Sequence, residues 1–200
     1  MKVIGIAGPP GCGKSAVAAH LARTPGFEWI DLDRVAWKLY KPESPAYRQL
    51  IARFGTGIVG ESGAIDRRTL SRIVFSDEKA RADLDAIVHP AVSEALRRII
   101  AEQRVNGTQV LLVEGALLGI SPHVDYSLFD AVIWFHAPRE VRRARLAKAG
   151  REAHLDRVPE HPTMPGVTVV DAAGTIAETA ERVRALIARL DERAAGAQNP

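Results

Sequence analysis

Apolar and polar positions along the chain fall into blocks that predict an α/β fold. Five short segments are mostly apolar, as expected of strands that are buried on both faces of a sheet. They cover residues 3–7, 27–33, 108–115, 128–137 and 166–172. The segments between them carry apolar residues at helical spacing or other helix signals. These cover 14–22, 34–40, 45–55, 67–74, 77–88, 90–104, 138–150 and 175–190. Such alternation predicts a mainly parallel five-stranded sheet covered by helices.

The stretch between the second and third predicted strands is too long for a simple crossover. Residues 41–104 are rich in helical pattern, with a small hairpin or turn expected over 57–66. We therefore expect an inserted substrate-binding subregion at 41–104, within one domain whose core covers 1–40 and 105–192. The last residues, 193–200, are expected to form a disordered tail.

The amino-acid composition and the net charge exclude several classes of function. Hydrophobic residues make up 46% of the chain and charged residues 26%, which is typical of a globular protein in water. The single cysteine, Cys12, excludes an internal disulfide and a cysteine-cluster metal site. A net charge of +3 without a polybasic run predicts neither nucleic acid nor membrane as a partner. A cytoplasmic location is the expectation.

The stretch GPPGCGKS, directly after the first predicted strand, carries the strongest chemical signal. It matches the spacing G-x-x-x-x-G-K-[ST] in full. Its glycines let successive N–H groups wrap a phosphate at a helix N-terminus. Lys14 is expected to reach the β- and γ-phosphates of ATP, and Ser15 to ligate Mg²⁺. The predicted nucleotide-binding residues are Gly8, Pro9, Pro10, Gly11, Cys12, Gly13, Lys14, Ser15 and Ala16.

Cys12 lies inside this loop, and two interpretations are open. The favoured one is a small residue that the loop tolerates. In the other, the helix N-terminus lowers the pKa of the thiol, and oxidation then blocks phosphate binding.

Carboxylates follow two of the predicted strands, where ligands of open α/β sheets bind. Asp31 and Asp33 end the second strand, and Glu114 ends the third. Asp33 suits a general base that takes a proton from a hydroxyl acceptor. Glu114 suits a water-mediated contact to magnesium. Helix capping is the alternative role for either aspartate.

Basic residues crowd the segment after the fourth strand. Arg142, Arg145 and Lys148 are spaced by three and share a helical face that suits closure over a transferring phosphoryl group. A solvated basic face is the alternative. Elsewhere, the run AIDRRTL contributes Arg67. The run IVHPAV contributes His89, and its proline is expected to start a helix and to keep His89 outside it.

Taken in order, these segments resemble the dephospho-CoA kinase family. The resemblance covers about residues 3–146 and rests most on IDRRTLSRIVFSD and LDAIVHP. It implies a P-loop kinase with a three-layer nucleotide-binding core, a helical CoA-binding region and a lid at about 139–165. It also implies transfer of the γ-phosphoryl group of ATP to the ribose 3′-hydroxyl of dephospho-CoA. Asp33 would activate that hydroxyl, Arg67 and His89 would line the acceptor side, and Arg145 would stabilise the transferring phosphate.

The chain departs from the family pattern mainly in the lid. The segment AKAGREAHLDRVPEHPTMPG lacks the usual further arginine and glutamine, so Lys148 or Arg151 would have to substitute. Two alternatives to dephospho-CoA kinase therefore stay open. One is a related kinase for a nucleoside or sugar hydroxyl, and the other is a nucleotide-binding regulator with weak transferase activity. Either a monomer or a small homo-oligomer is compatible with the sequence.

Overall fold

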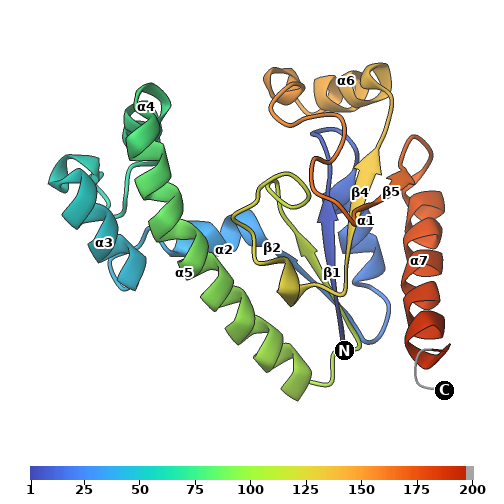
Figure 1. The fold of residues 1–200 in the computed structure, drawn as a ribbon. Helices are drawn as coiled ribbons and strands as arrows, with labels where there is room; N and C mark the ends of the chain where they lie inside the picture. The colour runs from blue at the N-terminus through green and yellow to red at the C-terminus, as the bar shows by residue number, and fades with distance from the viewer. Residues whose placement is uncertain (197–200) are drawn as a thin grey trace. The chain divides into compact units, whose positions relative to one another are not determined.

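The five predicted strands form one sheet in the computed structural model, which describes residues 1–196 of the chain. The strands are β1 (Lys2–Ala7), β2 (Phe27–Asp31), β3 (Val110–Glu114), β4 (Ala131–His136) and β5 (Thr168–Asp171). Their order in the sheet is β2-β3-β1-β4-β5, and β1 lies parallel to both β3 and β4 (Figure 1). The mainly parallel five-stranded sheet expected from the apolar segments is confirmed.

The chain divides into two compact units. The core unit comprises Met1–Ile30, Asn106–Pro122 and the chain from Ser127 onward. The helical unit comprises Asp31–Val105 and His123–Tyr126. No helix in the part of the chain that the structure describes is long and apolar enough to cross a membrane.

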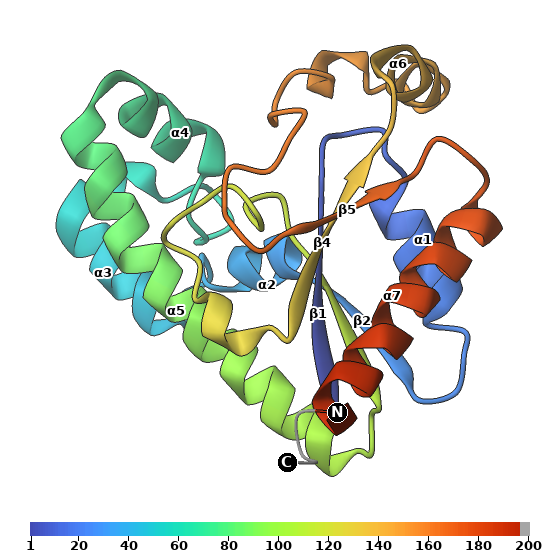
Figure 2. The same cartoon turned by 45° about the vertical axis from the view of Figure 1, so that its right-hand side comes forward.

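Helices α1 (Lys14–Leu21) and α7 (Ile176–Gly196) pack against one face of the sheet (Figure 2). The buried side chains there include Ile4, Leu112 and Phe135 from the strands, and each stabilises the fold by about 1.5–3 kcal/mol. Because side chains alternate along a strand, the odd-numbered positions of β1 face the other way, where Gly5 lies against Leu118.

Helix α7 begins with a reciprocal cap. The hydroxyl of Thr175 accepts a hydrogen bond from the N–H of Glu178 at 3.2 Å, and the Glu178 carboxylate accepts one from the N–H of Thr175 at 2.8 Å. The helix continues to Gly196, so residues 193–196 are helical where a disordered tail was expected. The rest of that predicted tail, 197–200, lies outside the described residues.

The remaining helices of the core unit follow the fourth strand. They are α6 (Arg139–Lys148) and the short η3 (Glu152–His154). A further short turn, η2 (Tyr126–Leu128), lies where the chain passes from the helical unit back to the core unit.

The helical unit contains α2 (Leu32–Lys38), α3 (Pro45–Phe54), η1 (Thr56–Ile58), α4 (Arg67–Ser76) and α5 (Glu78–Val105). Helices α2, α3 and α4 all contact α5. A small apolar core of Leu50, Ile58, Ile65 and Leu70 holds them together. The expected turn over 57–66 is present as a single antiparallel bridge between Val59 and Ile65.

Two predicted boundaries in this unit are wrong. Residues 77–88 and 90–104 form one helix, α5, with Pro90 inside it, so His89 is helical rather than held outside. Proline costs one backbone hydrogen bond, but packing against three other helices keeps α5 continuous through it. The second strand ends at Asp31, so Asp33 lies in the first turn of α2 and not at a strand end.

Candidate active site

The loop between β1 and α1 has the backbone geometry that its glycines predict. Gly8 and Gly11 have φ values of 132° and 85°, which other residues rarely adopt. A Cβ on Gly8 would collide with the carbonyl oxygen of Phe135, and one on Gly11 would come within 2.7 Å of the carbonyl oxygen of Arg142. Both glycines are therefore required for the loop to lie this close to β4 and α6.

Lys14 is folded over this loop. Its ammonium group donates to the carbonyl oxygens of Gly8 at 2.8 Å and Pro9 at 3.2 Å. Lys14 is also the first residue of α1, whose N-cap is Gly13, a residue with no side chain to accept from the helix N–H groups. A loop of this form, with a cation beside the start of a helix, is suited to hold an anion such as a phosphate.

Ser15 and Glu114 meet beside the loop. The Ser15 hydroxyl donates to Oε1 of Glu114 at 2.7 Å, so the end of β3 lies against the first turn of α1. A hydroxyl and a carboxylate are oxygen ligands of the kind that Mg²⁺ prefers. Among the described residues there is no cluster of three or more His, Cys, Asp or Glu that could hold a metal. This pair fits an ion that takes most of its ligands from water and phosphates.

Cys12 is a buried residue of the loop itself. Burial raises the pKa of its thiol, and the opposing effect of the nearby Lys14 and Arg142 charges is smaller. The thiol is therefore protonated and shielded, which favours the interpretation of Cys12 as a small residue that the loop tolerates.

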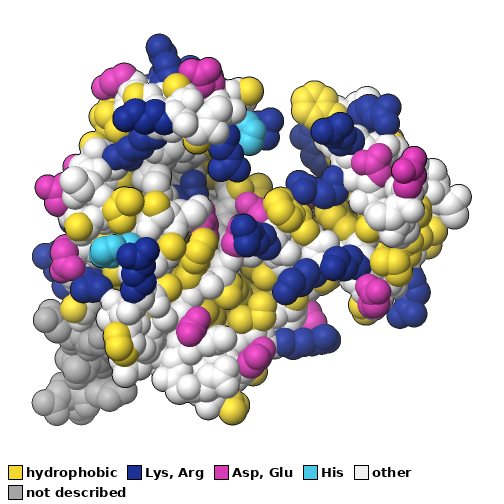
Figure 3. Space-filling model, turned by 180° about the vertical axis from the view of Figure 1, so that it is seen from behind, with side chains coloured by type: hydrophobic (Ala, Val, Ile, Leu, Met, Phe, Trp, Pro, Cys, Tyr) yellow, Lys and Arg dark blue, Asp and Glu magenta, His cyan; other side chains and the backbone are white. Residues whose placement is uncertain are grey.

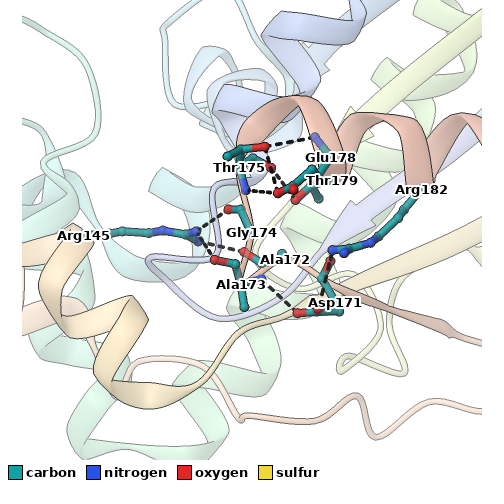
Figure 4. Close-up of polar contacts among 9 residues, drawn as sticks. All are labelled: Arg145, Asp171, Ala172, Ala173, Gly174, Thr175, Glu178, Thr179 and Arg182. Atoms are coloured by element: carbon teal, nitrogen blue, oxygen red, sulfur yellow. Dashed lines mark hydrogen bonds and ion pairs between the residues drawn. The ribbon is translucent and has the colours of Figure 1, made fainter.

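Arg145 reaches from α6 to the loop after β5. Its guanidinium donates to the carbonyl oxygens of Ala172, Ala173 and Gly174 at 2.8–2.9 Å (Figure 4). It also donates, more weakly, to the carbonyl oxygen of Gly11 at 3.4 Å. These contacts make it one wall of a cavity of about 340 Å³ in the core unit. The other walls come from the phosphate-binding loop, α1 and the start of α7. In this structure Arg145 thus joins three segments through backbone carbonyls.

The other arginines of α6 bind the segment that follows the helix. Arg142 is only 1% exposed and donates to the carbonyl oxygens of Ala137 and Leu155 and to the Glu160 carboxylate. Arg139 pairs with Asp156 at the surface. Figure 3 shows basic and acidic side chains interspersed around α6. Of the predicted basic face, Arg142 is therefore buried, Arg145 binds backbone carbonyl oxygens, and Lys148 is exposed.

Asp33 lies on the exposed side of α2, in the helical unit. The cap of α2 is instead Asp31, whose carboxylate accepts from the N–H groups of Asp33 and Arg34. The capping alternative is thus confirmed for Asp31, whereas Asp33 lies in the first turn of the helix.

Arg67 stacks on an aromatic side chain that sequence reasoning missed. Its guanidinium lies 4.4 Å from the ring centroid of Trp37. Trp37 is 46% exposed, which is unusual for so large an apolar side chain. Its position four residues after Asp33 on a helix was the signal that could have identified it.

His89 lines a cavity of about 360 Å³ within the helical unit. Its Nε2 lies 3.6 Å from the Asp85 carboxylate, and its ring centroid lies 5.3 Å from that of His123. The same cavity is lined by Arg97, which is ion-paired with Asp125 at 2.5 Å. The predicted residues thus form two groups: Lys14, Ser15, Glu114 and Arg145 in the core unit, and Asp33, Arg67 and His89 in the helical unit.

A glycine-rich loop that leads from a central parallel strand into a helix, with Lys14 and Ser15 at the helix start, defines a P-loop nucleotide-binding protein. The crystal structure of TT1252 from Thermus thermophilus has this fold, with a TM-score of 0.69 and 30% sequence identity. The match covers 94% of this chain and 97% of that one.

Sequence relatives identify the family. A family model described as dephospho-CoA kinase matches residues 2–157. The dephospho-CoA kinase of Frankia casuarinae is 35% identical over 97% of this chain and 87% of its own length. That of Syntrophotalea carbinolica is 34% identical over 95% of this chain and 92% of its own. The chain belongs to the dephospho-CoA kinase family and is thus a P-loop kinase.

Proposed function

We propose that this protein transfers the γ-phosphoryl group of ATP to the ribose 3′-hydroxyl of dephospho-CoA, giving CoA and ADP. The observation that carries the proposal is the family match over residues 2–157, in a chain whose phosphate-binding loop has the required backbone geometry.

In this proposal Asp33 acts as the general base. Its carboxylate takes the proton from the 3′-hydroxyl as that oxygen forms a bond to the γ-phosphorus. The bond between the γ-phosphorus and the β–γ bridging oxygen breaks, and ADP leaves with that electron pair. The exposed position of Asp33, two residues after a strand of the parallel sheet, supports this role because ligands of such sheets bind beyond the carboxyl ends of the strands.

The cations have separate tasks. Lys14 is proposed to release its two carbonyl contacts and to hold the β- and γ-phosphates. Arg145 is proposed to stabilise the transferring phosphate, as expected from the sequence, and its contacts with the loop after β5 support a second task in shaping the nucleotide pocket. Arg67 and His89 are proposed to bind the acceptor.

Magnesium would be held at the oxygen pair of Ser15 and Glu114, where Ser15 would be a direct ligand and Glu114 would act through water. When bound, the ion neutralises charge on the phosphates of ATP. We also propose a cytoplasmic enzyme that acts as a monomer or small homo-oligomer, has a lid at about 139–165 and does not bind nucleic acid or membranes.

The test is an ATP-consumption assay with several acceptors: dephospho-CoA, adenosine, AMP and simple sugars. Stimulation by dephospho-CoA alone supports the proposal. Stimulation by a different acceptor indicates the related small-molecule kinase. Binding of ATP without acceptor-dependent turnover indicates a regulatory protein.

A further inference from the structure

Trp37 shares the exposed face of α2 with Asp33. Residues 33, 34, 37 and 38 of this helix are exposed, while Leu32 is buried. Positions four apart on a helix are neighbours, separated by about one turn of 5.4 Å. A flat apolar surface, 46% exposed, therefore stands next to the proposed general base.

Arg67 fixes the orientation of this surface. It begins α4, and its guanidinium lies 4.4 Å from the Trp37 ring centroid. The attraction between a cation and an aromatic face holds the indole against α4 and restricts its rotation. A tryptophan that is both exposed and oriented in this way is prepared to stack on another ring, since little conformational freedom is left to lose on binding.

Tyr40 links Arg67 electrostatically to a residue of the cavity around His89. Burial raises the pKa of Tyr40, and the charges of Arg67 and Asp85 both act on this phenol, in opposite directions. Asp85 in turn lies 3.6 Å from His89. Arg67 and Asp85, a residue of the His89 cavity, thus both act on the Tyr40 phenol within the helical unit.

We propose that Trp37, oriented by Arg67, is the surface on which the adenine ring of the acceptor stacks. This inference rests on the proposed function, in which Asp33 acts on the ribose 3′-hydroxyl. The adenine base and the 3′-hydroxyl are both attached to the same ribose ring. The surface that holds the base must therefore lie about the width of one sugar from the Asp33 carboxylate. One helical turn supplies this separation. Trp37 then selects acceptors that carry a base over those that are sugars alone.

Steady-state kinetics give the first test. Trp37→Ala should raise the KM for dephospho-CoA about tenfold, because the stacking of one base on an aromatic side chain is worth about that factor or more. The KM for ATP should not change. Trp37→Phe keeps an aromatic face, so its KM for dephospho-CoA should rise much less. Phe75→Ala is the matched control, since Phe75 is an 83% exposed aromatic residue of the same unit. An unchanged KM for dephospho-CoA in Trp37→Ala, or a rise in the KM for ATP, overturns the inference.

Binding without ATP gives the second test and does not depend on turnover. Dephospho-CoA should quench the tryptophan fluorescence of the native protein. In Trp37→Phe that quenching should disappear although calorimetry still detects binding. Calorimetry with 4′-phosphopantetheine, which lacks the base, should show the same affinity in the native protein and in Trp37→Ala. Quenching that persists in Trp37→Phe overturns the inference.

The two proposals fail in different ways. If the native protein phosphorylates dephospho-CoA and Trp37→Ala does so with a native KM, the stacking role is wrong and the proposed function stands. If the native protein neither binds nor phosphorylates dephospho-CoA, the proposed function itself is wrong. Circular dichroism spectra of both Trp37 variants establish that the helical unit is folded.

Discussion

The Ser15 hydroxyl lies 2.7 Å from Oε1 of Glu114, which joins the first turn of α1 to the end of β3. Glu114→Gln keeps an acceptor oxygen but removes the negative charge. We expect the Mg²⁺ concentration for half-maximal activity to rise about 10- to 100-fold, as is typical when a group supporting a metal ligand is lost. Titration of Mg²⁺ at fixed ATP measures this. Glu102→Gln, on the exposed surface of α5, is the control, and identical titration curves for the two variants would contradict the role of Glu114.

Asp33→Asn removes a base but keeps the shape of the side chain. The variant should bind ATP normally and lose about 10²- to 10⁴-fold in kcat, the contribution typical of general-base catalysis. Glu43→Gln, an exposed carboxylate of the same unit, should keep native turnover. A native kcat in Asp33→Asn would remove Asp33 from the mechanism.

Arg142→Met removes a buried guanidinium that binds two carbonyl oxygens and the Glu160 carboxylate. Glu160 is half-exposed and regains water, so the loss falls mainly on the two backbone carbonyls. The free energy of unfolding should decrease by about 2–3 kcal/mol. Denaturant unfolding without nucleotide measures the change, with the surface variant Arg143→Met as the reference. Equal stability of the two variants would show that the buried contacts contribute little.

His89 makes stability depend on pH. Burial lowers the pKa of its imidazole below the usual 6.5, although Asp85 raises it and His123 lowers it to lesser degrees. The unfolded chain therefore takes up a proton at a higher pH than the folded protein. The free energy of unfolding should decrease as pH falls below about 6.5, and the loss is complete below the pKa of the folded state. His89→Gln should make this dependence shallower, as chemical unfolding across that pH range can show. If His89→Gln leaves the pH dependence of the free energy of unfolding unchanged, then other groups cause that dependence.

Cys12 should resist oxidation. Since its thiol is buried and burial raises its pKa, a thiol reagent should react slowly with the folded protein and quickly in denaturant. Mild peroxide should leave ATP binding intact in both the native protein and Cys12→Ser. Loss of binding in the native protein alone would support a redox switch instead.

The parts of the fold that could be predicted are those marked by the residues of the element itself. The sheet followed from apolar segments, because a strand buried on both faces shows its character in its own residues. The continuity of α5 through Pro90 could not be predicted, since it depends on packing against α2, α3 and α4. The predicted start of α2 is too late because the predicted strand continues to Asp33, past the helix cap at Asp31.

In the candidate site too, some features could be predicted from the sequence and others could not. The phosphate-binding loop was predicted because one continuous motif contains its glycines, lysine and serine. The stack of Arg67 on Trp37 joins residues thirty positions apart, and no periodicity reports such a contact. The partners of Arg145 are carbonyl oxygens of residues 172–174, which any sequence would supply. Spacing alone therefore could not distinguish Arg145 from a solvated arginine.

The division of the chain into two units limits how the protein can be truncated. The backbone passes between the units at 30–31, 105–106, 122–123 and 126–127. Neither unit is a continuous piece of sequence, so no single truncation yields one of them intact. The two units are joined by four peptide connections. A cut in any one of them leaves the units linked through the other three.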